Sequence, residues 1–220
     1  MSAIRTGGGR PDGYYLKDGK RVPGVTTVLK YKDVGGLLKW AWKCGRDNID
    51  IDKARDTAAD AGHLAHQWID DEIHDRPLAD SPLPQETHDK ARSAYEAFLR
   101  WRDGNKLEII ETESPLVSEQ HRFGGTFDAL ARASGRLILL DWKSSNGVYP
   151  EYLCQLGGYD ILVEEHRSLV EGAELLRFGK EEADFHHHSF TRAILDVGRR
   201  GFILQRELYD INARLGKVVK

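Results

Sequence analysis

The chain has little cysteine, no long apolar run and no strong excess of charge of either sign. Two cysteines occur among its 220 residues, Cys44 and Cys154, too few for a disulfide framework and without metal-ligand spacing. We expect each to be a buried thiol. No apolar stretch approaches membrane-spanning length, and the polar, glycine-rich first residues do not resemble a secretion signal. These absences lead us to expect a cytoplasmic protein with no membrane partner.

The net charge of −3 does not by itself indicate a nucleic-acid-binding protein, but the charge is unevenly distributed. Residues 1–50 carry ten Lys and Arg against five Asp and Glu; residues 51–100 carry six against eleven; residues 191–220 carry seven against three. Two interpretations remain open. Basic ends around an acidic middle would place a cationic track beside an acidic metal site, or the charges simply cover solvated helix faces.

The apolar patterns predict one α/β domain. Residues 1–12 are expected to be a disordered leader, and a short hairpin turning on Asp18-Gly19 should follow it. The remaining expected elements are a helix beginning near Thr26 or Thr27, helices Leu37–Arg46, Ile51–His74, Gln85–Gly104, Pro150–Glu165 and Thr191–Leu215, and strands Leu107–Val117, Thr126–Ala133, Arg136–Trp142, Glu174–Phe178 and Ala183–Ser189.

This order predicts a single domain over residues 13–220 with two parts. Residues 13–105 should form a mostly helical N-terminal lobe, and residues 106–220 an α/β core whose central mixed sheet is flanked by helices. An apolar content of 40% is enough to bury one good core. The closing helix carries apolar residues at Ile194, Val197, Ile203 and Leu204.

The hairpin within residues 124–145 carries the strongest functional signal. Its strands flank the two-residue loop Ser134-Gly135, which places Asp128 opposite Asp141. Like charges facing each other across a ladder, about 5 Å apart, are destabilising. The second strand is nearly continuous apolar sequence, so both its faces should be buried. Such a pair is therefore tolerated only if a cation lies between the carboxylates or they share a proton.

Lys143 lies two residues after Asp141 and so on the same strand face, whereas Trp142 points to the other face. Two acids and a lysine then converge at the mouth of the hairpin. This convergence predicts a divalent-metal site for phosphodiester hydrolysis. The alternative is a solvent-exposed hairpin with a salt bridge.

Other residues carry weaker signals. His63 and His66 lie on nearly the same helix face, but no cysteines or further paired histidines at suitable spacing support a zinc site. Gln155 and Tyr159 share a face of the helix after the hairpin, and Glu113 lies in the strand before it. Three consecutive histidines, His186, His187 and His188, should alternate faces of a strand and are not expected to be ligands.

Taken in order, these segments resemble the PD-(D/E)XK nuclease superfamily and its RecB-like branch, which includes bacteriophage exonucleases and the mitochondrial genome maintenance exonuclease. The resemblance covers roughly residues 22–210. The matching segments are VPGVTTVL, the Gly-x-x-x-His helix in GHLAH, Glu113 on the first core strand, the Gly-x-x-Asp motif in GGTFD, the Asp-x-Lys motif in DWKSS and the Gln-x-x-x-Tyr motif in QLGGY.

The resemblance implies a restriction-endonuclease-like core that hydrolyses DNA with Mg²⁺ or Mn²⁺. His66, Asp128 and Asp141 would hold the metal, with the Trp142 carbonyl as a further ligand and Glu113 helping to bind a second ion. Lys143 would orient the attacking water or neutralise charge on the phosphate. Catalysis would thus involve these acids and Lys143, while Gln155 and Tyr159 position the DNA strand or the active-site groups.

Some features depart from those relatives. Certain relatives hold an iron–sulfur cluster with four cysteines, which two cysteines do not allow, and His63 follows Gly62 where relatives often have threonine. No P-loop or helicase motif is present, so DNA unwinding would need a recombination or helicase partner. The aromatic and basic run LKWAWKCGR, with Trp40 and Trp42, is a possible contact for single-stranded DNA.

The sequence therefore predicts a metal-dependent DNA exonuclease of phage or bacterial recombination and repair. Two alternatives remain open: a structure-specific or restriction-like endonuclease, and a DNA-binding module derived from a nuclease that has lost catalysis. Retention of Asp128, Asp141 and Lys143 argues against the second.

Overall fold

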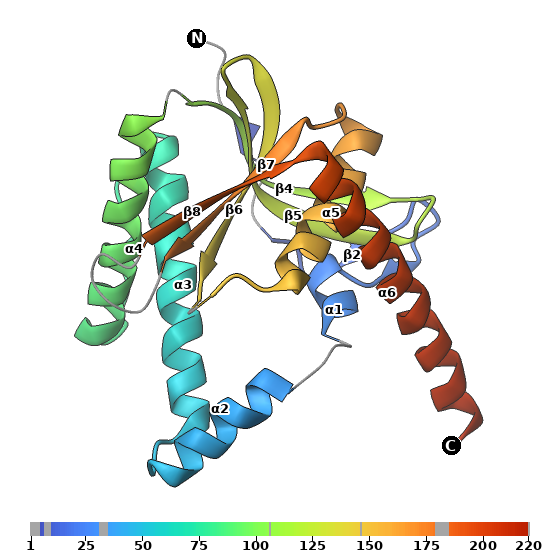
Figure 1. Cartoon of the computed structure of the whole chain (residues 1–220), viewed down its shortest axis with the longest axis horizontal. Coiled ribbons are helices and arrows are strands. Elements are labelled where there is room, and N and C mark those ends of the chain that lie inside the picture. Colours follow the sequence, from blue (N-terminus) through green and yellow to red (C-terminus); the bar gives the residue numbers. More distant parts are fainter. Residues whose placement is uncertain are drawn as a thin grey trace.

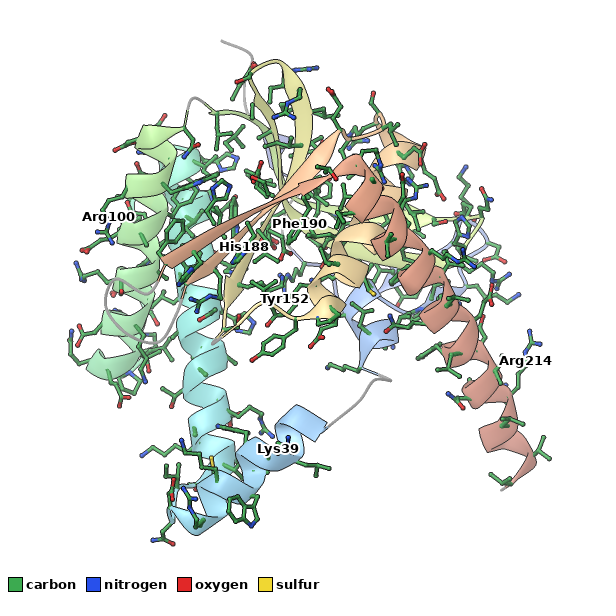
Figure 2. The ribbon with its side chains drawn as sticks, viewed as in Figure 1. Lys39, Arg100, Tyr152, His188, Phe190 and Arg214 are labelled. Carbon is green, nitrogen blue, oxygen red and sulfur yellow. The ribbon has the colours of Figure 1, made fainter. Side chains whose placement is uncertain are left out.

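In the computed structural model, the chain forms a six-stranded sheet between two groups of helices (Figure 1), and Figure 2 shows the side chains on the same view. The structure describes residues 5–6, 10–30, 35–105, 107–145, 147–178 and 185–219. The strands are β1 (Arg5–Thr6), β2 (Tyr14–Tyr15), β3 (Arg21–Val22), β4 (Leu107–Ser118), β5 (Phe123–Ala133), β6 (Arg136–Ser144), β7 (Gly172–Phe178) and β8 (Phe185–Thr191). The helices are α1 (Val25–Leu29), α2 (Gly35–Arg46), α3 (Ile51–Ile73), α4 (Gln85–Gly104), α5 (Pro150–His166) and α6 (Arg192–Val218).

The strand order of the large sheet is β1-β4-β5-β6-β7-β8. Neighbouring strands are antiparallel except at β1–β4 and β6–β7. The parallel step from β6 to β7 is possible because α5 crosses over between them. The predicted mixed sheet flanked by helices is therefore confirmed, as is the β2–β3 hairpin that turns at Gly19.

The N-terminal segment differs from the expected disordered leader. Residues 1–4 and 7–9 lie outside the described residues, but Arg5–Thr6 form β1 and pair with Glu111 and Thr112 of β4. The expectation of disorder is wrong for these two residues because the edge of β4 offers main-chain groups that a further strand can pair with.

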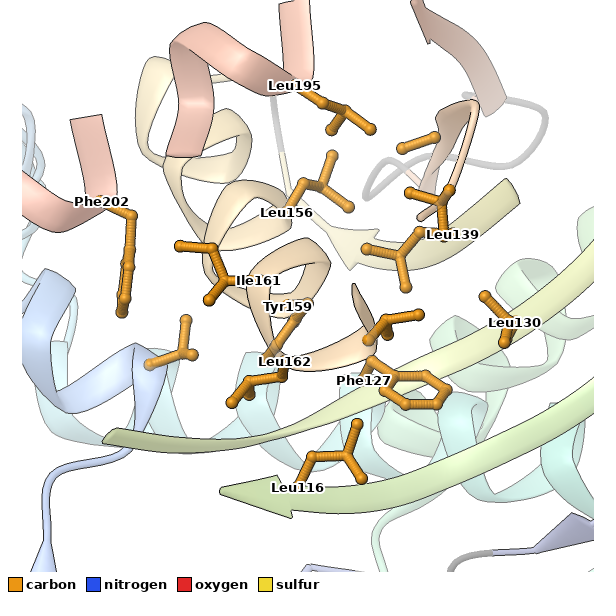
Figure 3. Packing of buried hydrophobic residues seen from close by; sticks show 14 of the residues in the cluster. Leu116, Phe127, Leu130, Leu139, Leu156, Tyr159, Ile161, Leu162, Leu195 and Phe202 are labelled. Atoms are coloured by element: carbon orange, nitrogen blue, oxygen red, sulfur yellow. The ribbon is translucent and has the colours of Figure 1, made fainter. Parts of the chain in front are cut away.

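Two apolar clusters lie on opposite faces of the sheet. On one face, Phe127 and Leu139 of the sheet pack against Leu156 of α5 and Phe202 of α6 (Figure 3). On the other face, Trp68 of α3 and Phe98 of α4 belong to one cluster with Trp142 of β6. The clusters fix α3 on one side of the strands and α5 on the other. Both helices can therefore direct side chains toward the end of the β5–β6 ladder, whose last pair is Ala129 and Leu140.

Helix α6 packs through a face that the apolar pattern does not reveal. Its buried residues are Leu195, Gly198, Phe202 and Arg206, whereas Ile194, Val197 and Leu204 are exposed and Ile203 is half-buried. The second half of α6 projects away from the sheet toward the C-terminus (Figure 1). Within the described part of the chain, no helix is both long enough and apolar enough to cross a bilayer.

Candidate active site

The hairpin register brings Asp128 and Asp141 to the same end of the ladder between β5 and β6. Ala133 pairs with Arg136 and Ala129 with Leu140, as the two-residue loop predicts. The ladder ends at that last pair, so the two acids are not a paired position of the sheet. Instead, the main-chain N–H of Trp142 donates to Oδ2 of Asp128 over 2.8 Å.

Glu113 supplies a third acid from the other side of Asp128. Its neighbours Thr112 and Ser114 pair with Ala129 and Phe127 of β5, so Glu113 lies at the position of β4 that faces Asp128. The main chain of Glu113 adopts a left-handed conformation, with φ of 42°. Such a conformation is costly for a residue other than glycine and is common at functional sites. Three neighbouring strands thus each contribute one carboxylate to a single place.

His66 of α3 completes a possible set of metal ligands. Its Nδ1 lies 3.8 Å from Oδ1 of Asp128. One ligand atom from each of His66, Glu113 and Asp128 lies within 4.8 Å of the others. Burial and the positive charges of Lys143 and Arg10 lower the pKa of His66 to about 3. The imidazole is therefore neutral at pH 7, the form that binds a metal.

Asp141 and Lys143 form an ion pair on the same face of β6, as the sequence predicts. Asp141 lies outside the group of three close ligands, and one of its oxygens is directed at Lys143. Its buried Oδ1 accepts no hydrogen bond from any described residue. A buried carboxylate oxygen in this state is costly, and a bound cation would satisfy it.

The acids show the electrostatic cost of their proximity. Burial, followed by the charge of Asp128, raises the pKa of Glu113 to about 8. Burial raises the pKa of Asp128 above its ordinary value, and burial with the charge of Asp128 raises that of Asp141 to about 6 despite Lys143. A divalent cation among these groups would favour their ionised forms. Together with the unsatisfied Oδ1 of Asp141, this shows that the residues fit a divalent metal.

Gln155 and Tyr159 project from α5 toward the acids. The amide of Gln155 donates to the hydroxyl of Tyr159 over 2.9 Å. Burial and the charges of Asp128 and Asp141 raise the pKa of Tyr159 far above its ordinary value, so the hydroxyl stays protonated. Gly125 permits this arrangement, because a Cβ there would lie 2.9 Å from the Tyr159 ring.

Arg10 is a residue of the site that the sequence did not indicate. Its guanidinium lies 3.6 Å from Oδ1 of Asp128 and 3.8 Å from Oε2 of Glu113. The side chain is half exposed, so these contacts are weak. The only signal in the sequence was a lone arginine in a segment interpreted as disordered, and that signal is too weak to identify it.

The remaining sequence candidates occupy other positions. The Trp142 ring packs edge-on against Phe98, away from the acids, while its main chain contacts Asp128. His63 is exposed. The histidines of β8 alternate faces: His187 contacts Glu174, whereas His186 stacks on His188. None of these four histidines belongs to a potential metal-binding group within the described residues.

The two basic ends of the chain meet at a separate hollow of about 860 Å³. The N-terminal part contributes Arg21, and the second half of α6 contributes Arg206, Arg214 and Lys217. Arg122, at the turn before β5, also lines it. Two acidic residues, Asp12 and Asp210, line it as well, so the hollow built from both ends of the sequence has an excess of basic side chains; none of the acids of the candidate active site lines it.

Comparison with known proteins gives a family match over most of the chain. The PD-(D/E)XK nuclease superfamily matches residues 14–211. Among solved structures, an alkaline exonuclease from Laribacter hongkongensis is 12% identical, with a TM-score of 0.38 over 73% of this chain and 93% of that one. Its complex with dAMP is also 12% identical, with a TM-score of 0.38 over 74% and 92%.

A third structure, named SSO0001, is 13% identical with a TM-score of 0.30 over 67% of this chain and 74% of that one. No curated protein matches.

Proposed function

Since the chain belongs to the PD-(D/E)XK nuclease superfamily, we propose that it is a Mg²⁺- or Mn²⁺-dependent DNA exonuclease of the RecB-like branch, acting in phage or bacterial recombination or repair. The mixed sheet with its flanking helices is the restriction-endonuclease-like core of that superfamily. The observation that carries the proposal is the set of three acids on β4, β5 and β6, with His66 and Lys143 beside them.

The proposed metal ligands are the imidazole of His66 and the carboxylates of Asp128 and Glu113, with Asp141 contributing its unpaired Oδ1. The carbonyl of Trp142 remains a predicted ligand. Carboxylate oxygens suit Mg²⁺, and one imidazole is well tolerated by Mn²⁺. When bound, such an ion polarises a phosphate and acidifies a coordinated water.

Lys143 is the group best placed to act on the phosphate. Its ammonium group pairs with Asp141 and lies 5.4 Å from the centre of the Tyr152 ring. Its side chain is only 15% exposed, so its charge is little screened and would stabilise negative charge that builds on the reacting oxygens. Gln155 and Tyr159 would position the strand or the acids, because their hydrogen bond fixes the Tyr159 hydroxyl beside Asp128 and Asp141.

Two surfaces support binding of DNA rather than of a small phosphodiester. Trp42 on α2 is 67% exposed, and the guanidinium of Arg46 lies 5.1 Å from the centre of its ring. An exposed aromatic ring beside a cation is suited to stacking an unpaired base. The basic hollow lined by Arg21, Arg122 and Arg214 is suited to phosphate groups.

The test is the incubation of purified protein with end-labelled linear single-stranded DNA, linear duplex and covalently closed circles. Each substrate is combined with Mg²⁺, Mn²⁺ or a chelator. The proposal expects metal-dependent loss of label from linear DNA while circles stay intact. Cutting of circles would indicate an endonuclease, and the absence of degradation under every condition would indicate a binding module.

Variants separate catalysis from folding. We expect Asp128→Asn, Asp141→Ala and Lys143→Ala each to lower the rate at least about 100-fold. Asp128→Asn should not lower the melting temperature of the metal-free protein, because it removes a buried charge that is raised in energy by burial. Asp103→Asn, on the exposed end of α4, is the matched control and should leave the rate unchanged. Full metal-dependent activity in Asp141→Ala and Lys143→Ala would refute the mechanism.

A further inference from the structure

The projecting half of α6 carries a continuous apolar stripe that no described residue covers. Five large apolar side chains lie along it, each between 45% and 82% exposed: Leu204, Leu208, Ile211, Leu215 and Val218. Scattered exposed apolar residues are ordinary, but a contiguous row indicates an interaction surface. We call these five residues the α6 seam.

The spacing of the seam is that of a coiled coil. Its residues follow one another at alternating intervals of four and three positions, the a and d positions of a heptad repeat. The face of α6 that packs on the protein is a different one, formed by Leu195, Gly198, Phe202 and Arg206. The helix therefore has one apolar face for the core and a second, coiled-coil face for another helix.

We propose that the α6 seam pairs with the same seam of a second copy of the chain, in an antiparallel two-helix coiled coil. This inference goes beyond the proposed nuclease activity and does not depend on it. The seam lies on the part of α6 that projects from the sheet (Figure 1), so two copies can approach with their sheets at opposite ends of the paired helices.

The charges beside the seam favour this occupant and this register. In an antiparallel pair, the positions that precede each a residue lie opposite one another. The a positions of the seam are Leu208 and Leu215, which Glu207 and Arg214 precede. Arg200 holds the same position one heptad earlier. When Leu208 of one copy packs against Ile211 of the other, Glu207 of each copy lies opposite Arg214 of the other. The dimer then gains two symmetric ion pairs.

The other arrangements lack this complementarity. An antiparallel pair shifted by one heptad places Glu207 opposite Glu207 and Arg200 opposite Arg214 of the second copy, so like charges meet. A parallel pair places Glu207 opposite the uncharged Asn212 of the second copy and forms no ion pair. The sequence of α6 therefore complements itself in one orientation and one register.

The apolar area is sufficient for a specific but moderate association. The exposed parts of the five seam residues, taken from both copies, amount to about 1,000 Å², near the lower limit for a specific interface. We therefore expect a reversible dimer whose population increases with protein concentration.

Sedimentation equilibrium and size-exclusion chromatography with light scattering test the proposal on the full chain. The wild type should show a dimer that forms as concentration rises. Leu208→Glu should abolish the dimer. Val197→Glu, on the same helix face but outside the paired register, is the matched control and should leave it unchanged.

A charge exchange tests the register itself. Glu207→Arg and Arg214→Glu should each weaken dimerisation about tenfold, because each replaces two ion pairs with two repulsive contacts. Combining the two substitutions should restore the wild-type dimerisation constant. All variants should keep the wild-type melting temperature at a concentration where the protein is monomeric, because both side chains are exposed.

Three results would overturn the proposal. The first is a wild type that stays monomeric up to several hundred micromolar. The second is a dimer that Leu208→Glu does not affect. The third is a Val197→Glu variant that disrupts the dimer as strongly as Leu208→Glu, which would indicate the shifted register.

Discussion

The contact between α5 and α6 makes a sharp prediction about two glycines. Gly157 of α5 and Gly198 of α6 face each other where the helices cross. A Cβ on Gly157 would lie less than 3.0 Å from main-chain atoms of Gly198 and Arg199, and a Cβ on Gly198 less than 3.0 Å from the carbonyl of Leu153. Main-chain atoms of a packed helix cannot rotate aside, so alanine at either position must separate the helices.

The expected cost follows from two opposing terms. Overpacking at a tight contact costs about 3 kcal/mol when rigid groups must move. Replacing a helical glycine by alanine returns about 1 kcal/mol. We therefore expect Gly198→Ala to lower the free energy of unfolding by about 2 kcal/mol and the melting temperature by about 4–8 °C.

Gly216 provides the matched control within the same helix. A Cβ there would meet no heavy atom within 4 Å. Gly216→Ala should therefore gain the helix-forming term alone and raise the stability by about 0.5–1 kcal/mol. Urea unfolding followed by circular dichroism measures both variants. Equal stability of Gly198→Ala and Gly216→Ala would refute the packing argument.

The same contact is coupled to the candidate active site. Gly157 lies between Gln155 and Tyr159 on α5, so separating the helices also displaces these side chains. Because Gly157→Ala and Gly198→Ala crowd the same contact and both force the helices apart, the double variant should lose less stability than the sum of the two single variants. Additive losses would show that the two glycines act independently.

Three further predictions concern other contacts. Arg10→Ala should raise the apparent affinity for Mg²⁺ by up to about fivefold in calorimetric titration, because it removes a competing, half-exposed cation whose two ion pairs are together worth up to about 1 kcal/mol; unchanged affinity would contradict this. Trp42→Ala should weaken binding of single-stranded DNA more than that of duplex in fluorescence anisotropy, and equal losses would argue against base stacking. The hydrogen bond from Tyr95, followed by the one from Arg102, lowers the pKa of Glu72. The stability that ionised Glu72 contributes is therefore present above pH 4.5 and is lost as pH falls through the lowered pKa. Tyr95→Phe should thus lower the free energy of unfolding by about 1 kcal/mol at pH 7, a value already reduced because Glu72 is about one-third exposed. The loss should become progressively smaller below pH 4.5, and a loss independent of pH would contradict the assignment.

The core of the site could be predicted from the sequence because its geometry is local. A two-residue turn and strict alternation fix which residues face each other across β5 and β6, and they place Lys143 beside Asp141. Local rules do not show where a ladder ends. The main-chain N–H of Trp142 is taken up by Asp128, and this bond replaces the expected facing pair of acids.

Local sequence rules cannot predict contacts between segments that lie far apart in the chain. Arg10 reaches Asp128 only because the N-terminal segment runs beside β4, and nothing near Arg10 in the sequence encodes that path. The left-handed main chain of Glu113 could not be predicted either, because glutamate has no local preference for that conformation.

The face of α6 that packs on the core was also not predictable from periodicity. Both of its apolar faces satisfy a helical repeat, one through Leu195 and Phe202 and the other through Leu204 and Leu208. Only the position of α5 in the folded chain decides which of them is covered.

The position of Arg10 makes the N-terminal segment an internal competitor of the metal. A cation bound by Asp128 and Glu113 would compete with the guanidinium of Arg10, so metal binding and these two contacts would be linked equilibria that oppose each other. By reciprocity, a ligand that holds the segment in place would weaken metal binding by the same factor. Arg10 thus serves as an internal counter-ion that partly neutralises Asp128 and Glu113.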